Sequence, residues 1–237
     1  MKTIFYNAES RGHSNHGWLD SHHTFSFANY YNPDRVRFGA LRVLNDDRVS
    51  AGEGFGTHPH DNMEIVSIPL FGELEHKDSM GNHGTITTGE IQVMSAGTGI
   101  FHSEFNKNKD KEVQFLQIWI LPDKKNVTPR YDQISIADIA KPDELSQILS
   151  PNPNDQGVWI HQQAWFYIGE LSKGWNGKYN LNVKNNGVYF FVIEGEVSIA
   201  GQALNRRDGL GVSETDEIEI IAKNDSRLLV MEVPMIV

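Results

Sequence analysis

Residues 54–60 read GFGTHPH, and this run of glycine, histidine and proline is the strongest indication of fold and chemistry in the 237-residue sequence. His58 and His60 are separated by one residue, and on a β-strand that spacing puts both imidazoles on the same face. A lone pair of this kind is more often a surface or hydrogen-bonded pair than a ligand set. The pair therefore needs further ligands nearby before it indicates a metal.

A second run, GTGIFHSE at residues 97–104, repeats the same geometry. His102 and Glu104 also stand one residue apart, so they share one face of a strand. A barrel that makes the two strands neighbours brings His58, His60, His102 and Glu104 to one interior point. Three neutral imidazoles and one carboxylate suit a divalent first-row metal and leave coordination positions open, which indicates a reactive rather than a purely structural site.

Other ionisable residues are weaker candidates for metal ligands at this site. Glu64 has the same parity as the two histidines of the GFGTHPH run, so we rank it after Glu104, either in support of the ligands or as an alternative ligand. His22 and His23 could supply a cavity rim, although adjacent residues point to opposite faces of a strand. The remaining histidines are predicted to be hairpin or surface residues: His13, His16, His76, His83 and His161.

Period-two alternation between glycine-rich turns predicts an all-β fold with little helix. Turns that tolerate positive φ are predicted at SMGN (79–82), TGE (88–90) and GTG (97–99). Repeated strand, turn, strand units are typical of a β-barrel. The clearest strand segments are residues 64–70, 73–78, 113–121, 188–193 and 227–233.

Helix is expected at residues 135–149, where apolar residues recur at roughly helical spacing although Pro142 interrupts them. The SPNPND run at residues 150–155 is typical of a linker. We therefore predict three parts: an N-terminal metal-binding barrel over residues 1–125, a linker with a short helix over residues 126–155, and a C-terminal barrel over residues 156–237.

The two halves show a weak internal repeat, in which FGEL (71–74) before the turn at Gly89 resembles EGEV (194–197) before the turn at Gly209. We therefore predict that the C-terminal barrel is degenerate and binds no metal. An ungapped alignment maps the four N-terminal ligand candidates to residues that cannot form a comparable site: Leu181, Val183, Ala222 and Asn224.

Composition limits the function classes. The 21 Lys and Arg against 31 Asp and Glu give a formal net charge of -10, which disfavours nucleic acids and anionic membranes as partners. The chain has no cysteine, so imidazole and carboxylate are its strong metal ligands. The N-terminus lacks an apolar signal segment, and no stretch approaches the roughly 18 apolar residues of a membrane span. We expect a cytoplasmic protein.

Together, these sequence blocks resemble the pirin family, whose members are bicupins of the cupin superfamily. The resemblance implies two cupin-type barrels, of the double-stranded β-helix (jelly-roll) kind, packed face to face. The C-terminal half resembles a degenerate cupin in general terms. The chain departs from the family at Asp61-Asn62, where an arginine is usual, and we expect this to alter the charge at the cavity mouth. The matching runs are RG (11–12), HGWL (16–19), HTFSF (23–27), FGALRV (38–43), GFGTHPH (54–60), MEIV (63–66) and MSAGTGIFHSE (94–104).

The resemblance also implies a function. It implies one divalent metal ion held by His58, His60, His102 and Glu104, with iron(II) as the first expectation and Zn, Mn, Co, Ni or Cu as alternatives. Bacterial members imply a quercetin 2,3-dioxygenase activity, for which the partners are a small aromatic substrate and O2. In that reaction Glu104 would also be the catalytic base that accepts the proton of a flavonol hydroxyl.

Aromatic residues are candidates for the substrate pocket, although a small barrel also fills its core with such side chains. Two other functions stay open. One is a metal- or redox-sensing interaction protein that binds a protein partner without turnover, and the other is a metal-dependent isomerase or hydrolase. The pocket candidates are Trp18, Phe55 and Phe101, together with Phe25, Phe27 and Trp119.

Overall fold

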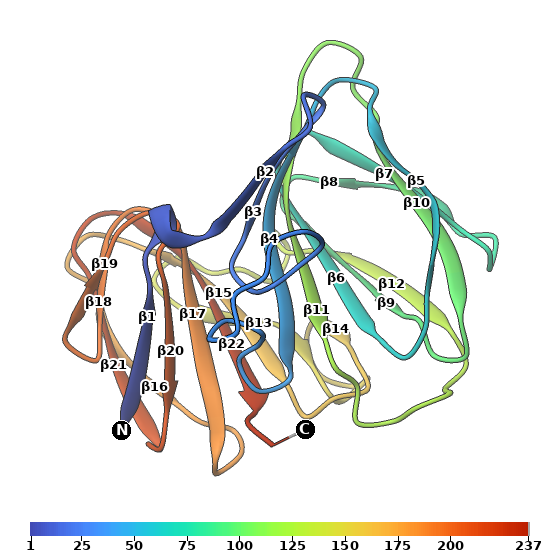
Figure 1. Cartoon of the computed structure of the whole chain (residues 1–237). Helices are drawn as coiled ribbons and strands as arrows, with labels where there is room; N and C mark the ends of the chain where they lie inside the picture. The colour runs from blue at the N-terminus through green and yellow to red at the C-terminus, as the bar shows by residue number, and fades with distance from the viewer. Residues whose placement is uncertain (237) are drawn as a thin grey trace.

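The computed structural model describes residues 1–236, which form two β-barrels side by side (Figure 1). The first barrel combines a seven-stranded sheet of order β12-β9-β6-β11-β4-β3-β2 with a four-stranded sheet of order β5-β10-β7-β8. Its strands are β2 (Gly12–Asn15), β3 (Leu19–His23), β4 (Leu41–Val49), β5 (Gly54–His60), β6 (Glu64–Phe71), β7 (Glu73–Asp78), β8 (His83–Thr87), β9 (Glu90–Ser95), β10 (Ile100–Asn106), β11 (Val113–Ile120) and β12 (Arg130–Ser135).

The second barrel has the same layout, with sheets of order β1-β20-β17-β22-β15-β13-β14 and β16-β21-β18-β19. The N-terminal strand β1 pairs with β20, so the chain begins in the second barrel and then crosses to the first (Figure 1). The strands are β1 (Lys2–Tyr6), β13 (Leu145–Ser150), β14 (Val158–Trp159), β15 (Trp165–Leu171), β16 (Asn176–Asn180), β17 (Asn186–Glu194), β18 (Val197–Ile199), β19 (Gln202–Leu204), β20 (Gly209–Ser213), β21 (Glu217–Ala222) and β22 (Ser226–Pro234).

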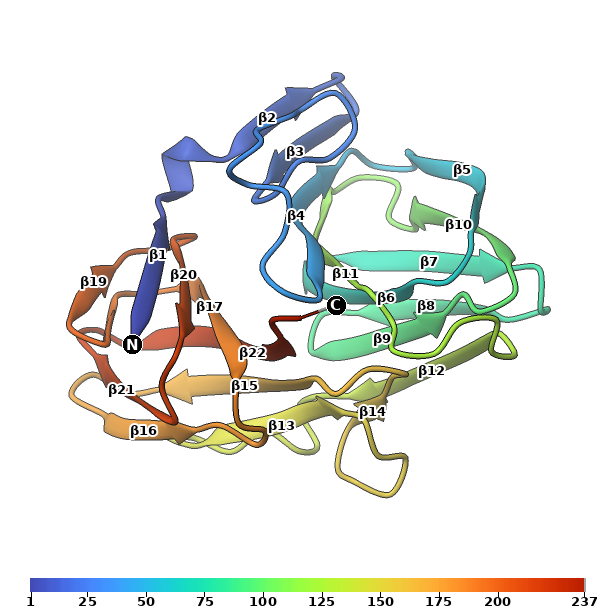
Figure 2. The ribbon, with the colours of Figure 1, turned by 60° about the horizontal axis from the view of Figure 1, so that its bottom comes forward.

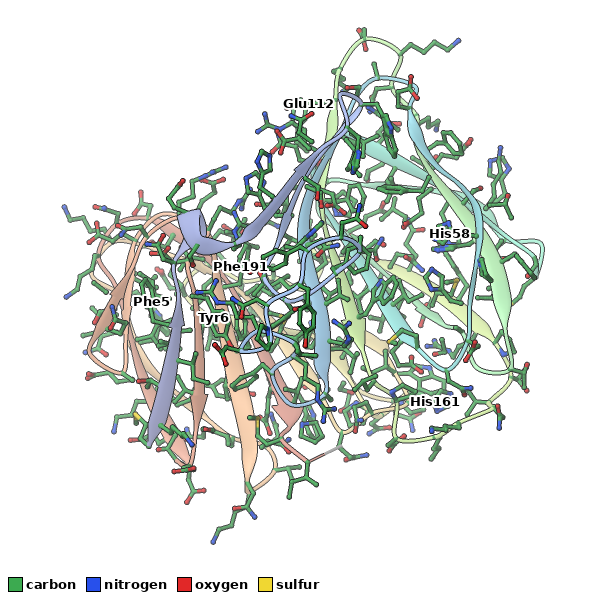
Figure 3. All side chains as sticks on the ribbon, in the orientation of Figure 1. Phe5, Tyr6, His58, Glu112, His161 and Phe191 are labelled. Atoms are coloured by element: carbon green, nitrogen blue, oxygen red, sulfur yellow. The ribbon has the colours of Figure 1, made fainter. Side chains whose placement is uncertain are left out.

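The two barrels pack through the faces of their seven-stranded sheets, as the turned view makes visible (Figure 2). One hydrophobic cluster contains buried residues of both barrels, among them Ile118 from β11, Phe166 from β15 and Phe191 from β17. Phe191 lies between the barrels in Figure 3. The prediction of an all-β fold with two barrels packed face to face is therefore confirmed.

Alternate side chains of β11 point to opposite faces, one toward the second barrel and the other into the interior of the first. Leu116, Ile118 and Ile120 belong to the cluster between the barrels. Phe115 packs in a separate cluster within the first barrel, and Gln117 donates a hydrogen bond to a buried carboxylate there. Because both faces of the strand are covered, its sequence is mostly apolar, and its one polar residue in the barrel interior is Gln117.

The strand segments predicted from sequence are all present, and the glycines of the predicted turns, Gly81, Gly89, Gly97 and Gly99, have positive φ. The predicted helix at residues 135–149 is wrong. The chain makes one turn after β12, with Ala140 N–H donating to the carbonyl of Ile136, and then enters β13. Pro142 and the left-handed Asp143 (φ 57°) stop any continuation of that turn.

Within residues 1–236, regular helix is limited to the 3-10 turn η1 (Ala8–Ser10), and the structure has no helix long and apolar enough to cross a bilayer. The stretch predicted as a linker instead supplies one strand to each barrel, β12 to the first and β13 to the second. We propose that the boundary between the two halves lies at residues 136–144.

Strand pairing corrects the alignment between the halves. Leu74 and Val197 are equivalent positions, because each lies two residues after the glycine of its turn, Gly72 or Gly195. Leu74 pairs with Asn106 of β10, and Val197 pairs with Ala222 of β21, so Asn106 and Ala222 are equivalent too. Counting back along β21, Ile218 and Ile220 correspond to His102 and Glu104, in place of Ala222 and Asn224. Both isoleucines are fully buried in the core of the second barrel, where their side chains cannot bind a metal.

The packing between the barrels predicts a large stability effect at its centre. Phe166 is 0% exposed in the shared cluster, so Phe166→Ala should lower the free energy of unfolding by about 3–5 kcal/mol. Phe71→Ala is the matched control, because Phe71 is 46% exposed and its loss should cost about 0.5 kcal/mol or less. Urea denaturation measures both, and equal effects would contradict a shared core.

Candidate metal centre and cavity

Three histidines meet inside the first barrel because β5 and β10 are neighbours in the four-stranded sheet. His58 lies directly opposite His102, and His60 lies opposite Ile100. The ring centroids of His58, His60 and His102 are 4.4 to 4.9 Å apart. One ring nitrogen from each lies within 4.8 Å of the other two. In Figure 3, His58 lies within the first barrel.

Two rings of the cluster, those of His60 and His102, are held in the neutral form. Burial, reinforced by the neighbouring rings, lowers the pKa of His60 and of His102 to about 3. A neutral imidazole offers a nitrogen lone pair, which is the form that binds a metal. The Nε2 atom of His102 is buried and has no hydrogen-bond partner within the described chain. These donors fit a divalent cation, which would satisfy the orphaned nitrogen.

Hydrogen bonds fix two of the rings. The Nδ1 atom of His58 lies 2.8 Å from the carbonyl oxygen of Gly56, and donation there leaves Nε2 free for a metal. The Nδ1 atom of His102 lies 3.1 Å from Nε2 of His76. With the Nε2 lone pair of His102 kept for a metal, its Nδ1–H donates to His76, which accepts. Each contact fixes the orientation of a candidate ligand.

His76 was predicted to be a hairpin or surface residue, and that prediction is wrong. It is 0% exposed and lies on β7, which pairs with β10 and places His76 opposite Glu104. Burial lowers the pKa of His76, so this ring is also neutral. A sequence signal existed, because His76 stands at the same strand parity as the buried Leu74.

Glu104 follows His102 at the next inward position of β10 and is 3% exposed. Its carboxylate accepts hydrogen bonds from Ser67 Oγ at 3.1 Å and from Gln117 Nε2 at 2.8 Å. Within residues 1–236, the compact ligand group comprises the three histidines, and Glu104 stands beside it. The fold brings all four predicted ligands to one region, with Glu104 held by two donors.

Glu64 does not share the face of the two histidines, so the parity argument fails for it. Between β5 and β6 the chain turns at Asn62 (φ 44°), which breaks the alternation. Glu64 accepts a hydrogen bond from Ser95 Oγ at 2.6 Å on the opposite side of β6 from Ser67. Burial raises the pKa of Glu64 to about 7. Its role is in packing near the second barrel.

Beside the histidines lies a cavity of about 220 Å³ with a mixed aromatic and polar wall. Phe55 and Trp119 line it, as does Phe27, which stacks edge to face on Trp119. The lining residues are Ser14, His16, Leu19, Ser21, His23, Phe27, Ala28, Asn29, Asn45, Asp47, Phe55, His58, Glu104, Gln117 and Trp119.

The other aromatic candidates lie elsewhere. Trp18 packs edge to face on Phe55 and so supports the wall from behind. Phe25 belongs to the core between the barrels. Phe101 is 54% exposed, since it points to the opposite face of β10 from His102. Of the two adjacent histidines, His23 lines the cavity, whereas His22 faces away from it.

Two polar residues of the cavity wall, Asn45 and Asp47, were not identified from sequence. Within the described residues, three buried polar atoms there have no hydrogen-bond partner: His23 Nδ1, Asn45 Oδ1 and Trp119 Nε1. Asp47 is hydrogen-bonded by Ser21 Oγ, and burial raises the pKa of Asp47 to about 7. Polar residues at inward positions of otherwise apolar strands, as in Leu44-Asn45-Asp46-Asp47, are the signal that could have found them.

Residues 5–120 match the family model described as pirin, and residues 147–233 match the quercetinase C-terminal cupin domain. The chain is 44% identical over 227 residues to quercetin 2,3-dioxygenase of Escherichia coli K12, covering 96% of each protein.

Solved structures of proteins with the same names also superpose on this chain. The bacterial pirin YhhW of Escherichia coli in complex with nickel(II) superposes with a TM-score of 0.94 at 42% identity, covering 98% of this chain and 99% of that one. A quercetin 2,3-dioxygenase from Acinetobacter baumannii superposes with a TM-score of 0.80 at 25% identity, covering 98% of this chain and 85% of that one.

The contact between His76 and His102 predicts an effect on metal affinity. His76→Ala removes the group that orients His102, so the tightest nickel(II) equivalent should bind about 10–100-fold more weakly. Equilibrium dialysis measures the affinity. His83→Ala, which changes an exposed histidine on the adjacent strand β8, is the control and should bind as the wild type does. Unchanged affinity in His76→Ala would contradict an orienting role.

The raised pKa of Asp47 predicts a pH-dependent stability. Between its ordinary value of 3.8 and about 7, the folded protein keeps a proton that the unfolded chain has lost. The stability contributed by this carboxyl is therefore present at low pH and falls as pH rises through this window. Asp47→Asn removes the effect, so its stability relative to wild type should improve by about 2–4 kcal/mol from pH 4 to pH 8.

Urea denaturation at the two pH values tests this expectation. Asn45→Ala is the matched control, because it alters the same wall without changing a titratable group. Its stability difference from wild type should be the same at both pH values. A constant difference for Asp47→Asn as well would show that the buried carboxyl is ionised throughout.

Proposed function

The chain belongs to the pirin family, and from this premise we propose that its cavity is the active site of a metal-dependent dioxygenase that cleaves quercetin-like flavonols with O2. Membership makes it a cupin of a family that includes oxidoreductases named for that reaction. The observation that carries the proposal is the cluster of three histidines beside Glu104, opening on an aromatic-lined cavity.

We assign the metal ligands as His58, His60, His102 and Glu104. Iron(II) is the proposed ion, and the nickel(II) complex of YhhW is consistent with a site that accepts several divalent ions. Zn, Mn, Co and Cu are the further alternatives. When bound, the ion would act as a Lewis acid on the substrate oxygens, lowering the pKa of a coordinated hydroxyl and providing the redox-active centre needed for O2.

The side chains around the ligands then have separate tasks. Phe27, Phe55 and Trp119 offer apolar surface against which a flat ring system packs and from which water is excluded. Gln117 and Ser67 each donate to Glu104, so its carboxylate stays an acceptor in a fixed orientation. Glu104 is therefore placed to take the proton of the flavonol 3-hydroxyl at one of its carboxylate oxygens.

Unpartnered polar atoms of the cavity wall would bind the polar edge of the substrate. Asn45 Oδ1 accepts, Trp119 Nε1 donates, and His23 Nδ1 does either according to its tautomer. Burial lowers the pKa of His23 to about 4, so this ring is neutral. In the overall reaction both atoms of O2 enter the product, the central ring opens, and one ring carbon leaves as carbon monoxide.

Reconstitution with iron(II) tests the proposal. We expect the protein loaded anaerobically to consume O2 and quercetin together when air is admitted, followed by an oxygen electrode and by flavonol absorbance. A His58→Ala, His102→Ala double variant should lose this activity because it lacks two ligands. His83→Ala, on an exposed hairpin outside the cavity, should keep it.

Two outcomes would contradict the dioxygenase assignment and favour another function. One equivalent of bound iron with no quercetin loss would contradict the dioxygenase and favour the sensing function, in which a partner distinguishes iron(II) from iron(III). Metal-dependent turnover that needs no O2 would instead favour an isomerase or hydrolase.

A further inference from the structure

A second group of metal-binding side chains lies on the β2–β3 hairpin, formed by His13, Asp20 and His22. We propose that these three residues form a second divalent metal site, separate from the cavity. It does not depend on the proposed dioxygenase activity. The argument rests on strand register, on interatomic distances and on the charges around the group.

Strand pairing places the three side chains on one face of the hairpin. His13 of β2 lies directly opposite His22 of β3, and their rings stack with centroids 4.5 Å apart and planes 17° apart. Asp20 precedes His22 by two residues, so it points to the same face. Two ligands from β3 and one from β2 therefore converge, which is the arrangement by which a metal can join two strands.

The distances fit a small cation. Asp20 Oδ1 lies 3.0 Å from His13 Nε2 and 3.5 Å from His22 Nδ1, and the three ligand atoms lie within 4.8 Å of one another. Metal–ligand distances of about 2.0–2.2 Å in a tetrahedral site put neighbouring ligand atoms about 3.3–3.6 Å apart. A metal would thus replace the hydrogen bond between His13 and Asp20, and both contacts of the Asp20 oxygen are already close to the spacing that a metal requires.

The chemistry of the group favours a borderline divalent ion. Two imidazoles and one carboxylate suit zinc(II), nickel(II) or copper(II), whereas magnesium and calcium prefer oxygen ligands. Burial, helped by Arg11 and His13, lowers the pKa of His22, which keeps its lone pair available. The side chains of His13, Asp20 and His22 are 51%, 35% and 38% exposed, so solvent can supply the remaining ligands.

The arginines nearest to the site are paired with other carboxylates. Arg11 pairs with Asp46 at 3.3 Å, and Arg207 of the second barrel pairs with the same carboxylate at 3.0 Å. Arg48, opposite Asp20 on β4, lies 3.5 Å from Glu112. No arginine pairs with Asp20 within the described residues: its Oδ1 faces the two histidines, and its Oδ2 accepts a hydrogen bond from Asn15 Nδ2 at 3.4 Å.

Side chains alternate along β3, so the proposed site lies on the outer face of a strand whose inner face lines the cavity. Asp20 and His22 point away from the cavity, whereas Ser21 and His23 of the same strand line it. An ion on the outer face would link β2 to β3 and so stiffen one wall of the cavity. The hairpin also forms the edge of the first seven-stranded sheet, where each strand has fewer neighbours to hold it.

Zinc binding to the full chain tests the proposal. Equilibrium dialysis against zinc(II), with the metal counted by mass spectrometry, should show one equivalent fewer in His22→Ala than in wild type. The difference is expected whether or not the cavity histidines also bind zinc. His83→Ala is the control, because that exposed histidine pairs with Glu75 outside any three-ligand group in the described chain, and it should bind as wild type does.

A second measurement isolates the hairpin. In the His58→Ala, His102→Ala background, zinc should still bind at one equivalent and should slow amide exchange of residues 12–23, and adding His22→Ala should abolish both effects. Equal zinc content in His22→Ala and wild type would overturn the proposal, as would bound zinc without added protection of the hairpin. In either case the triad would be only a hydrogen-bonded cluster.

Discussion

The packing of the two seven-stranded sheets against each other is the constraint on which the rest of the molecule depends. It requires the central strands to be apolar on the side that faces the other barrel, and this requirement is met by Leu116, Ile118 and Ile120 of β11 and by Phe191 of β17. Burial of such side chains is the main favourable term in folding. Once that face is fixed, period-two geometry determines which residues point into each barrel.

The two barrels use their interiors in opposite ways. In the second barrel, Ile218 and Ile220 stand where the first has His102 and Glu104, and the interior is filled by an apolar cluster. Its buried Glu232 accepts hydrogen bonds from the Tyr179 hydroxyl and the Asn186 side chain, so that carboxylate serves as a structural anchor. The first barrel instead keeps unpartnered polar atoms around a cavity, which costs stability unless a ligand or water satisfies them. A well-packed second barrel helps the fold tolerate that cost.

Sequence reasoning succeeded where only local alternation mattered and failed where a turn or a distant partner decided the outcome. The spacing of His58 and His60 survives in β5 because a strand preserves parity, whereas the turn at Asn62 reverses it before Glu64. His76 enters the site because β7 pairs with β10, a register that no local pattern reveals. The same limit explains β1, whose partner β20 lies near the other end of the chain, and residues 145–150, whose pairing with β15 overrides a helical pattern.

The neutral state of His60 and His102 follows from the fold before any metal is considered. Rings with centroids 4.4 to 4.9 Å apart repel one another if charged, and the barrel interior offers little water to stabilise the charge. Protonation of His60 and of His102 is therefore disfavoured, and their lone pairs stay available. One ring nitrogen from each of the three histidines lies within 4.8 Å of the other two, so a divalent ion among them would find three donors close together. Hydrogen bonds from His102 to His76 and from His58 to Gly56 fix the ring directions in advance, so the protein bears the cost of arranging the ligands when it folds.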